Sequence, residues 1–188
     1  MSVLACLAVR PGAGLAQSAV PVRPLAFAGF EPGQSLASLN EQARAMDATL
    51  ACKVSRLDPS LRECRAELHD STGRSLALWL SAADSNASIT TIETQLPTAE
   101  LLRWQGRLLA TYGRARERSR GAQRSLQWIR ANTMMRLTWR PEGQGVAASV
   151  SLIDGGRLDA WGRRFEARLQ RRPATDSTRH DSLPATTP

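Results

Sequence analysis

The clearest folding signal in the chain lies in residues 126–154, LQWIRANTMMRLTWRPEGQGVAASVSLID. Apolar and polar residues alternate twice within it, which is typical of strands buried on one face. The two apolar sets are Met135, Leu137, Trp139 and Val146, Ala148, Val150, Leu152. If both sets face one core, Leu137 must lie opposite Val150, because a one-residue slip would turn one set outward. Met135 then lies opposite Leu152 and Trp139 opposite Ala148, with residues 142–145 as a four-residue hairpin loop.

Two amphipathic helices are predicted upstream of this hairpin. Ser35 suits a helix N-cap, and apolar residues follow it at helical spacing. Pro97 and Thr98 open a second apolar stripe, which Gly113 closes in the usual C-terminal capping position. Alternating segments follow each helix, so the sequence predicts an α+β fold with two helices packed on antiparallel sheet. The order of helix then strands, twice over, suggests an old duplication, although the two halves show no residue-by-residue match.

The domain organisation follows from where these patterns begin and end. Residues 27–161 are expected to form a single α+β domain, a normal size for one hydrophobic core. Residues 162–188 are polar, charged and rich in Pro and Thr, and are expected to form a disordered tail. Residues 1–26 are interpreted as a truncated signal segment and an extended lead-in.

The N-terminal residues resemble the back half of a secretory signal peptide. An apolar run over residues 1–9 leads to small residues, with cleavage plausible after Ala16 or Ala19. The basic segment that should come first is missing, which suggests a true start upstream of Met1. A lipidated Cys6 is an alternative that needs an even longer N-terminus. No run of 18 apolar residues occurs, so no membrane-spanning helix is expected.

Cys52 and Cys64 are symmetric about Asp58, in a segment that is typical of strand, Asp-Pro turn and strand. Their side chains then fall across from each other, with Lys53 facing Glu63 on the other face. We expect a disulfide and therefore an exported protein, periplasmic or extracellular. Two reduced, buried cysteines are the alternative.

The charge is unevenly distributed along the chain. The formal net charge is +8, and Lys53 is the only lysine, which a GC-rich coding bias explains as well as a binding function. Residues 103–140 contain ten arginines and one acid. Within them we expect a cationic loop that attracts nucleic acid, anionic lipid or lipopolysaccharide. Its residues are Arg114, Arg116, Arg118, Arg120 and Arg124. A solvated loop without a ligand is the alternative.

Catalytic signals are weak. His69 is the only histidine of the expected domain, and the adjacent Asp70 would point to the opposite strand face. Asp154 and Asp159 can be read as paired carboxylates, but the Asp-Gly-Gly context favours Asp154 as a turn residue. The sequence contains none of the common catalytic, nucleotide-binding or zinc-binding motifs. We therefore expect no enzyme, no metal and no cofactor.

The tryptophans allow two interpretations. Trp104, Trp128 and Trp139 stand at helical and strand spacing, which favours a place in the core over a stacking platform for bases or sugars.

A helix ending in Tyr112-Gly113, followed by a sheet with Trp128 and Trp139, resembles small exported modules of the beta-lactamase inhibitor protein type and the related outer-membrane assembly lipoproteins. The resemblance covers about residues 30–155. It implies a module that binds another protein and catalyses nothing. We expect a non-enzymatic exported or envelope-associated binding module, with an unknown protein partner or an anionic envelope component. Polyanion binding through residues 114–124 is the alternative.

Overall fold

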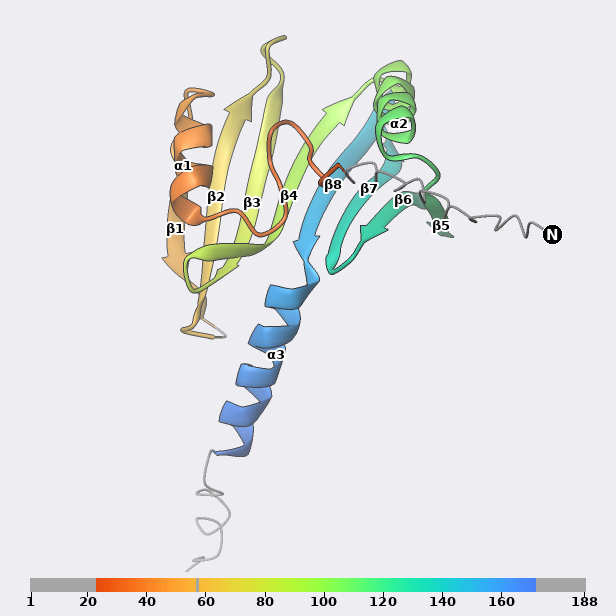
Figure 1. Cartoon of the computed structure of the whole chain (residues 1–188). Coiled ribbons are helices and arrows are strands. Elements are labelled where there is room, and N and C mark those ends of the chain that lie inside the picture. The colour runs from red at the N-terminus through yellow and green to blue at the C-terminus, as the bar shows by residue number, and fades with distance from the viewer. Residues whose placement is uncertain (1–22, 57, 172–188) are drawn as a thin grey trace, which may run out of the picture.

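The computed structural model describes residues 23–56 and 58–171, which form three helices and one eight-stranded antiparallel sheet (Figure 1). The strand order is β1-β2-β3-β4-β8-β7-β6-β5. A helix followed by four strands occurs twice, and β4 and β8 join the two halves at the centre of the sheet. The elements are α1 (Leu36–Arg44), β1 (Ala51–Val54), β2 (Leu61–His69), β3 (Ser75–Ala83), β4 (Asn86–Leu96), α2 (Thr98–Tyr112), β5 (Arg116–Arg120), β6 (Gln123–Arg130), β7 (Thr133–Glu142), β8 (Gly145–Asp154) and α3 (Gly155–Gln170).

The hairpin of β7 and β8 has the predicted register. Leu137 pairs with Val150, as Met135 does with Leu152 and Trp139 with Ala148. The predicted four-residue loop is wrong, because Glu142 and Gly145 also pair and leave a two-residue turn. Gly143, the first residue of this turn, has a φ of 57°, a conformation that glycine adopts without strain.

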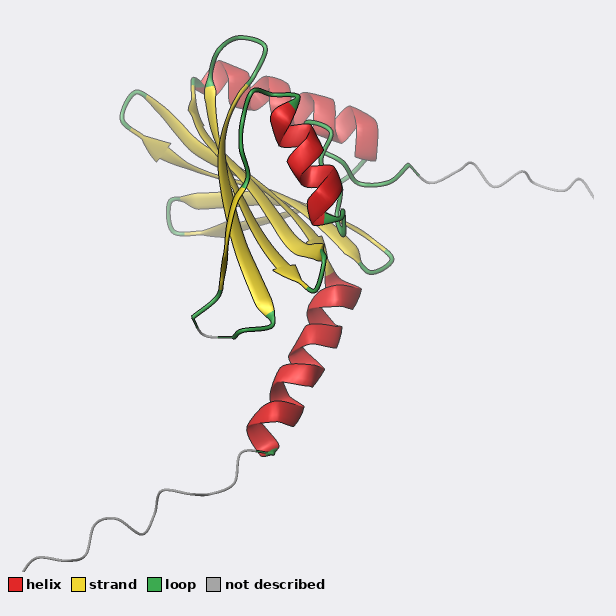
Figure 2. Ribbon diagram, turned by 90° about the vertical axis from the view of Figure 1, so that its left-hand side faces the viewer, coloured by secondary structure: helices red, strands yellow, loops and turns green. Residues whose placement is uncertain are grey.

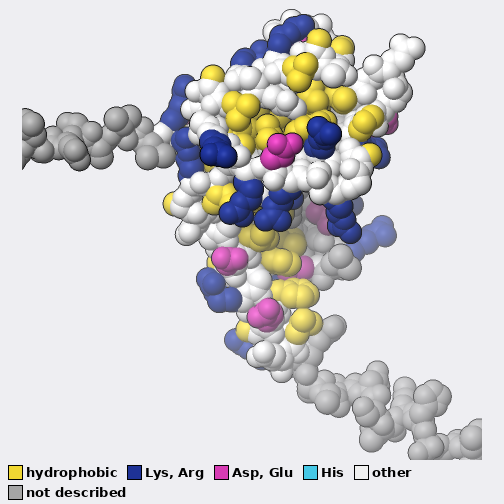
Figure 3. Space-filling view, turned by 90° about the vertical axis from the view of Figure 1, so that its right-hand side faces the viewer, with side chains coloured by type: hydrophobic (Ala, Val, Ile, Leu, Met, Phe, Trp, Pro, Cys, Tyr) yellow, Lys and Arg dark blue, Asp and Glu magenta, His cyan; other side chains and the backbone are white. Residues whose placement is uncertain are grey.

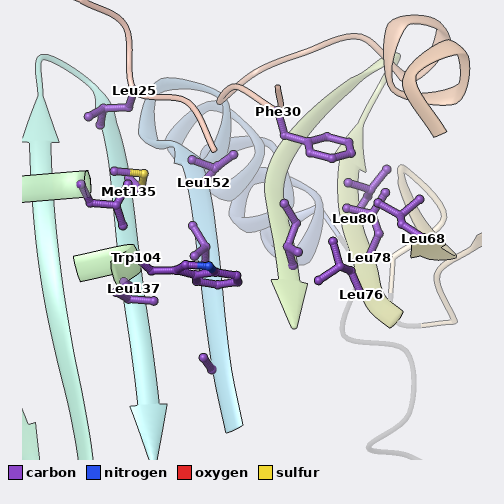
Figure 4. Close-up of a cluster of buried hydrophobic side chains, with 14 of the residues drawn as sticks. Leu25, Phe30, Leu68, Leu76, Leu78, Leu80, Trp104, Met135, Leu137 and Leu152 are labelled. Atoms are coloured by element: carbon purple, nitrogen blue, oxygen red, sulfur yellow. The ribbon is translucent and has the colours of Figure 1, made fainter. Parts of the chain in front are cut away.

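The core lies between the sheet and the pair of helices α1 and α2, which cover the same face (Figure 2). Leucines of β2 and β3 pack in one half, and Met135, Leu137 and Leu152 pack in the other (Figure 4). Trp104 of α2 and Phe30 lie between them. Leu25 and Phe30 are almost completely buried, so the ordered core begins slightly before the boundary expected at residue 27. The opposite face of the sheet, called the outer face below, is not covered by α1 or α2 (Figure 2).

The predicted caps of both helices are confirmed. The Ser35 hydroxyl accepts a hydrogen bond from the Ser38 amide at the start of α1. Pro97 precedes α2, and Gly113 follows it with a φ of 76°. The carbonyl of Gly113 also accepts a hydrogen bond of 2.9 Å from Trp128 Nε1. The end of α2 is therefore tied to β6.

This bond makes Trp128 a test of how α2 is held on β6. Replacing Trp128 with Phe keeps an aromatic ring but removes the donor to Gly113, and we expect a loss of about 1–2 kcal/mol in the free energy of unfolding. Urea denaturation measures this loss. The matched control is Trp139→Phe, since Trp139 is half-buried and has no side-chain hydrogen bond among the described residues. Equal losses at both positions would show that packing alone sets the contribution of Trp128.

Helix α3 is a departure from the sequence prediction. Asp154 is not a turn residue: its carboxylate accepts from the Arg157 amide at 3.1 Å and caps the helix. Gly155 and Gly156 form the first turn, and α3 continues through Gln170, past the expected boundary at residue 161. The expectation of an irregular tail is therefore wrong for residues 162–170. Residues 172–188 of that tail, and residues 1–22 with the expected signal segment and Cys6, lie outside the described part of the chain.

Asp58, in the turn between β1 and β2, holds α3 against the sheet. Its carboxylate is 2 % exposed and accepts from Trp161 Nε1 at 2.6 Å and from Arg168 at 2.7 Å. The Ser60 amide and hydroxyl donate to its other oxygen. Burial alone raises the pKa of Asp58, but these hydrogen bonds outweigh it and hold the pKa far below the usual value. Asp58 is therefore ionised at neutral pH.

The predicted disulfide joins Cys52 and Cys64, which are cross-strand partners with a Cα–Cα distance of 4.0 Å. Lys53 and Glu63 form the expected pair at 3.4 Å on the other face. Hydrogen bonds from Ser55 and Lys53 lower the pKa of Glu63. The disulfide links the short edge strand β1 to β2 and is consistent with an oxidising location. None of the described helices is both long enough and apolar enough to cross a bilayer.

Candidate anion-binding face

The arginine-rich segment is a strand where the sequence predicted a loop. Residues 116–120 form β5, the strand at one edge of the sheet, and a two-residue turn at Gly121 and Ala122 connects it to β6. The prediction was wrong because the segment alternates Arg with Glu and Ser and has no apolar residue to indicate a buried face. Pairing with the amphipathic strand β6 determines its structure instead.

Strand geometry places three of the predicted arginines on one face. Arg116, Arg118 and Arg120 are alternate residues, so their side chains project to the same side of the sheet, with Cα atoms about 6.8 Å apart from one to the next. All three are exposed, and no ion pair joins them to an acid in the described residues. Their partners on β6 are Gln127, Ser125 and Gln123.

Two further arginines share this face and were not predicted. Gln127 pairs with Arg136 of β7 as well as with Arg116, so the three side chains lie in one row across the strands. Arg140 is four residues further along β7, on the same side. Alternation of Arg136 and Arg140 with apolar residues was visible in the sequence, but their position beside β5 depends on the pairing of three strands. We call Arg116, Arg118, Arg120, Arg136 and Arg140 the arginine face.

The other two predicted residues do not join this group. Arg124 pairs with Trp139 and therefore lies on the side of the sheet that faces the helices. Arg114 precedes β5 and is exposed. The structure thus brings together three of the five predicted arginines and separates Arg124 from them.

The local electrostatics favour an anion. Glu117, the only acid of β5, projects to the side opposite the arginine face. Arg140 forms an ion pair with Glu142 at 3.3 Å. Arg136 has no acid as its partner among the described residues: with the Gln127 amide oriented to satisfy both groups, Arg136 Nε donates to the Gln127 side-chain oxygen at 2.8 Å. Seen from the β5 side, the surface has many Lys and Arg side chains and few acids (Figure 3).

A hollow of about 840 Å³ adjoins the arginine face at the end of β7. Arg140 and Gln123 line it on the arginine side, and Glu93 and Arg74 line it on the other. Small residues from several strands form much of the remaining lining: Ser75, Ala77, Thr138, Ala147 and Ser149. The hollow has room for side chains of a partner next to the arginines.

The residues weighed for catalysis are placed apart from the arginine face. His69 is exposed at the end of β2, opposite Ser75. Asp154 caps α3 and is paired with Arg157 at 3.2 Å, while Asp159 is exposed on that helix. Within the described residues, no three His, Cys, Asp or Glu side chains are grouped to hold a metal ion.

Trp104, Trp128 and Trp139, the three tryptophans weighed as a stacking platform, pack on the core side of the sheet, as predicted. Trp104 and Trp128 are buried, and Trp139 packs against the core at its edge.

No protein family, curated protein or solved structure matches the chain. The likeness to beta-lactamase inhibitor proteins and outer-membrane assembly lipoproteins therefore stays a prediction. What the structure defines is an α+β protein with an open, arginine-bearing sheet face.

Proposed function

We propose that this protein is a non-enzymatic, exported binding protein that takes an anionic partner on the arginine face. The observation that carries the proposal is the row of exposed arginines at alternate positions of β5, with Arg136 and Arg140 on the same side. Guanidinium groups are planar donors that bind carboxylates and phosphates in bidentate fashion. The disulfide supports export, because such bonds persist in oxidising compartments.

The fold explains how such a row is presented. Antiparallel pairing fixes each arginine at a defined distance from the next. The core beneath β6 and β7 holds these two strands in place. Side chains that extend from a rigid sheet lose less freedom on binding than those of a mobile loop, which favours affinity.

The proposal predicts how binding depends on salt. Replacing Arg116, Arg118 and Arg120 with Gln should weaken retention on heparin and on anionic vesicles, and should flatten the slope of log K against log salt by about two to three units. The melting temperature should hardly change, since exposed substitutions usually alter stability by about 0.5 kcal/mol or less. Salt-gradient chromatography and vesicle sedimentation measure the first effect, and calorimetry the second.

A matched triple variant controls for net charge. Arg44, Arg56 and Arg163 are exposed residues outside the arginine face, and their replacement with Gln removes the same charge. This control should retain most of the binding. If both triple variants lose retention equally, the total charge and not the arginine face attracts the anion, and the proposal fails.

A further inference from the structure

Within residues 23–56 and 58–171, strand β5 has no partner strand on one side of its backbone. It is the last strand in the sheet order, its pairing partner there is β6, and all five of its residues are exposed. Edge strands of this kind are templates on which an extended segment of another protein adds as a further strand. The other edge, β1, has only four residues.

The hairpin geometry identifies the backbone groups that face the free edge. Arg120 and Gln123 flank a two-residue turn, so they form a hydrogen-bonded pair, and the ladder alternates from there. The backbone groups of Arg116, Arg118 and Arg120 therefore point toward β6. Those of Glu117 and Ser119 point outward and present two N–H and two C=O groups to an incoming strand.

The side chains determine which strand fits. Residues of an added strand that lie opposite Arg116, Arg118 and Arg120 project to the outer face with them, two residues apart. Acidic side chains at alternate positions would each meet a guanidinium group. The free edge thus offers backbone hydrogen-bonding groups and arginine side chains, and both repeat every two residues, as an added strand does.

The same pattern opposes pairing with a second copy. If β5 paired antiparallel with itself about Arg118, then Arg116 would lie opposite Arg120 of the other copy, and like charges directly opposite are destabilising. Nucleic acid fits less well, because β5 has no aromatic residue and Trp128 of the neighbouring β6, which could stack on bases, is buried on the face that the helices cover.

We propose that β5 binds an extended, acidic segment of a partner protein, with Asp or Glu at alternate positions, as an additional strand of the sheet. This proposal rests on the proposed function, since it names the anionic partner of the arginine face.

The test separates backbone pairing from charge. Ser119→Pro removes one outward N–H but no bond of the β5–β6 ladder, and proline is tolerated where an edge N–H faces solvent. The control Ser119→Thr keeps the N–H. The probe is a nine-residue peptide of alternating Thr and Glu, titrated by calorimetry into the full, disulfide-bonded chain. A second peptide has the same sequence but carries N-methyl groups on the alternate residues whose amides would face β5. It tests backbone pairing without altering the protein.

We expect Ser119→Pro to weaken binding of the alternating peptide by about tenfold, while heparin retention is unchanged and Ser119→Thr binds like the wild type. The peptide methylated on the edge-facing amides should also bind about tenfold more weakly. If the methylated peptide binds the wild type as tightly as the unmethylated one, and Ser119→Pro binds the unmethylated peptide like the wild type, the added strand is overturned but the proposed anion binding stays intact. Preference for single-stranded DNA or anionic vesicles over the peptide would assign the face to another class of ligand. If wild-type protein is not retained on heparin at all, the proposed function itself fails.

Discussion

Replacing both Cys52 and Cys64 with Ala is expected to lower the free energy of unfolding by about 3 kcal/mol. The disulfide closes a loop across a sequence separation of 12 residues, and the chain-entropy relation gives that magnitude for a loop of this size. The loss should be concentrated in β1. This strand has four exposed residues and, in the described part of the chain, β2 is its single partner strand, so the disulfide is a large part of what holds it.

Guanidinium denaturation of the variant and of the wild type, with and without reductant, measures the effect. Amide exchange at Lys53 and Ser55, whose N–H groups face β2, should accelerate in the variant, whereas exchange in β7 and β8 should follow the global change only. Reduced wild-type protein serves as the control for the lost sulfur atoms. A loss under about 1 kcal/mol, with the protection of β1 unchanged, would mean that the ladder alone is sufficient.

Asp58→Ala is expected to cost about 3 kcal/mol and to release α3 from the sheet. The substitution leaves Trp161 Nε1 and the Arg168 guanidinium without their buried acceptor, and removing one partner of such a pair costs more than the pair contributes. Trp161 fluorescence and amide exchange in α3 report the release. Asp84→Asn is the matched control, because Asp84 pairs with Arg164 of the same helix at 3.4 Å but is 75 % exposed. It should change stability by less than about 0.5 kcal/mol. A similar loss in both variants would contradict the role of Asp58.

The same carboxylate predicts a pH dependence with a definite sign. The pKa of Asp58 is lower in the folded than in the unfolded chain, so its contribution is present above the unfolded value of about 4 and is lost as the pH falls toward the folded value. The stability difference between the wild type and Asp58→Asn should be constant above about pH 5 and shrink below it. A difference that grows on acidification would show that Asp58 is not held ionised.

Much of the fold could be predicted because the signals were local. The register of β7 and β8 follows from two alternating apolar sets, and the bounds of α2 follow from Pro97 and Gly113. Helix α3 was missed because Asp-Gly-Gly is a turn signal, and each glycine costs a helix about 1 kcal/mol. The spacing of Leu158, Trp161 and Phe165 is nevertheless helical and could have indicated it.

The candidate site was only partly predictable for a different reason. The arginine run was visible as composition, but whether its side chains share a face depends on β5 being a strand. Strand pairing places Arg136 and Arg140 on the arginine face and places Arg124 on the opposite side of the sheet. Likewise, Asp58 and Arg168 are 110 residues apart in sequence, and no local pattern connects them.

The central position of β4 and β8 has a consequence for how the chain folds. Every other pair of neighbouring strands is joined directly along the chain as a hairpin, whereas β4 and β8 pair residues as distant as Ile92 and Val150. Each half can therefore assemble from local contacts, and the pairing of β4 with β8, called the seam here, is the slow, non-local step. Until the seam closes, β4 and β8 are two unpaired edges that fit each other equally well between molecules. At high concentration, refolding chains should therefore exchange halves and form swapped dimers at this seam.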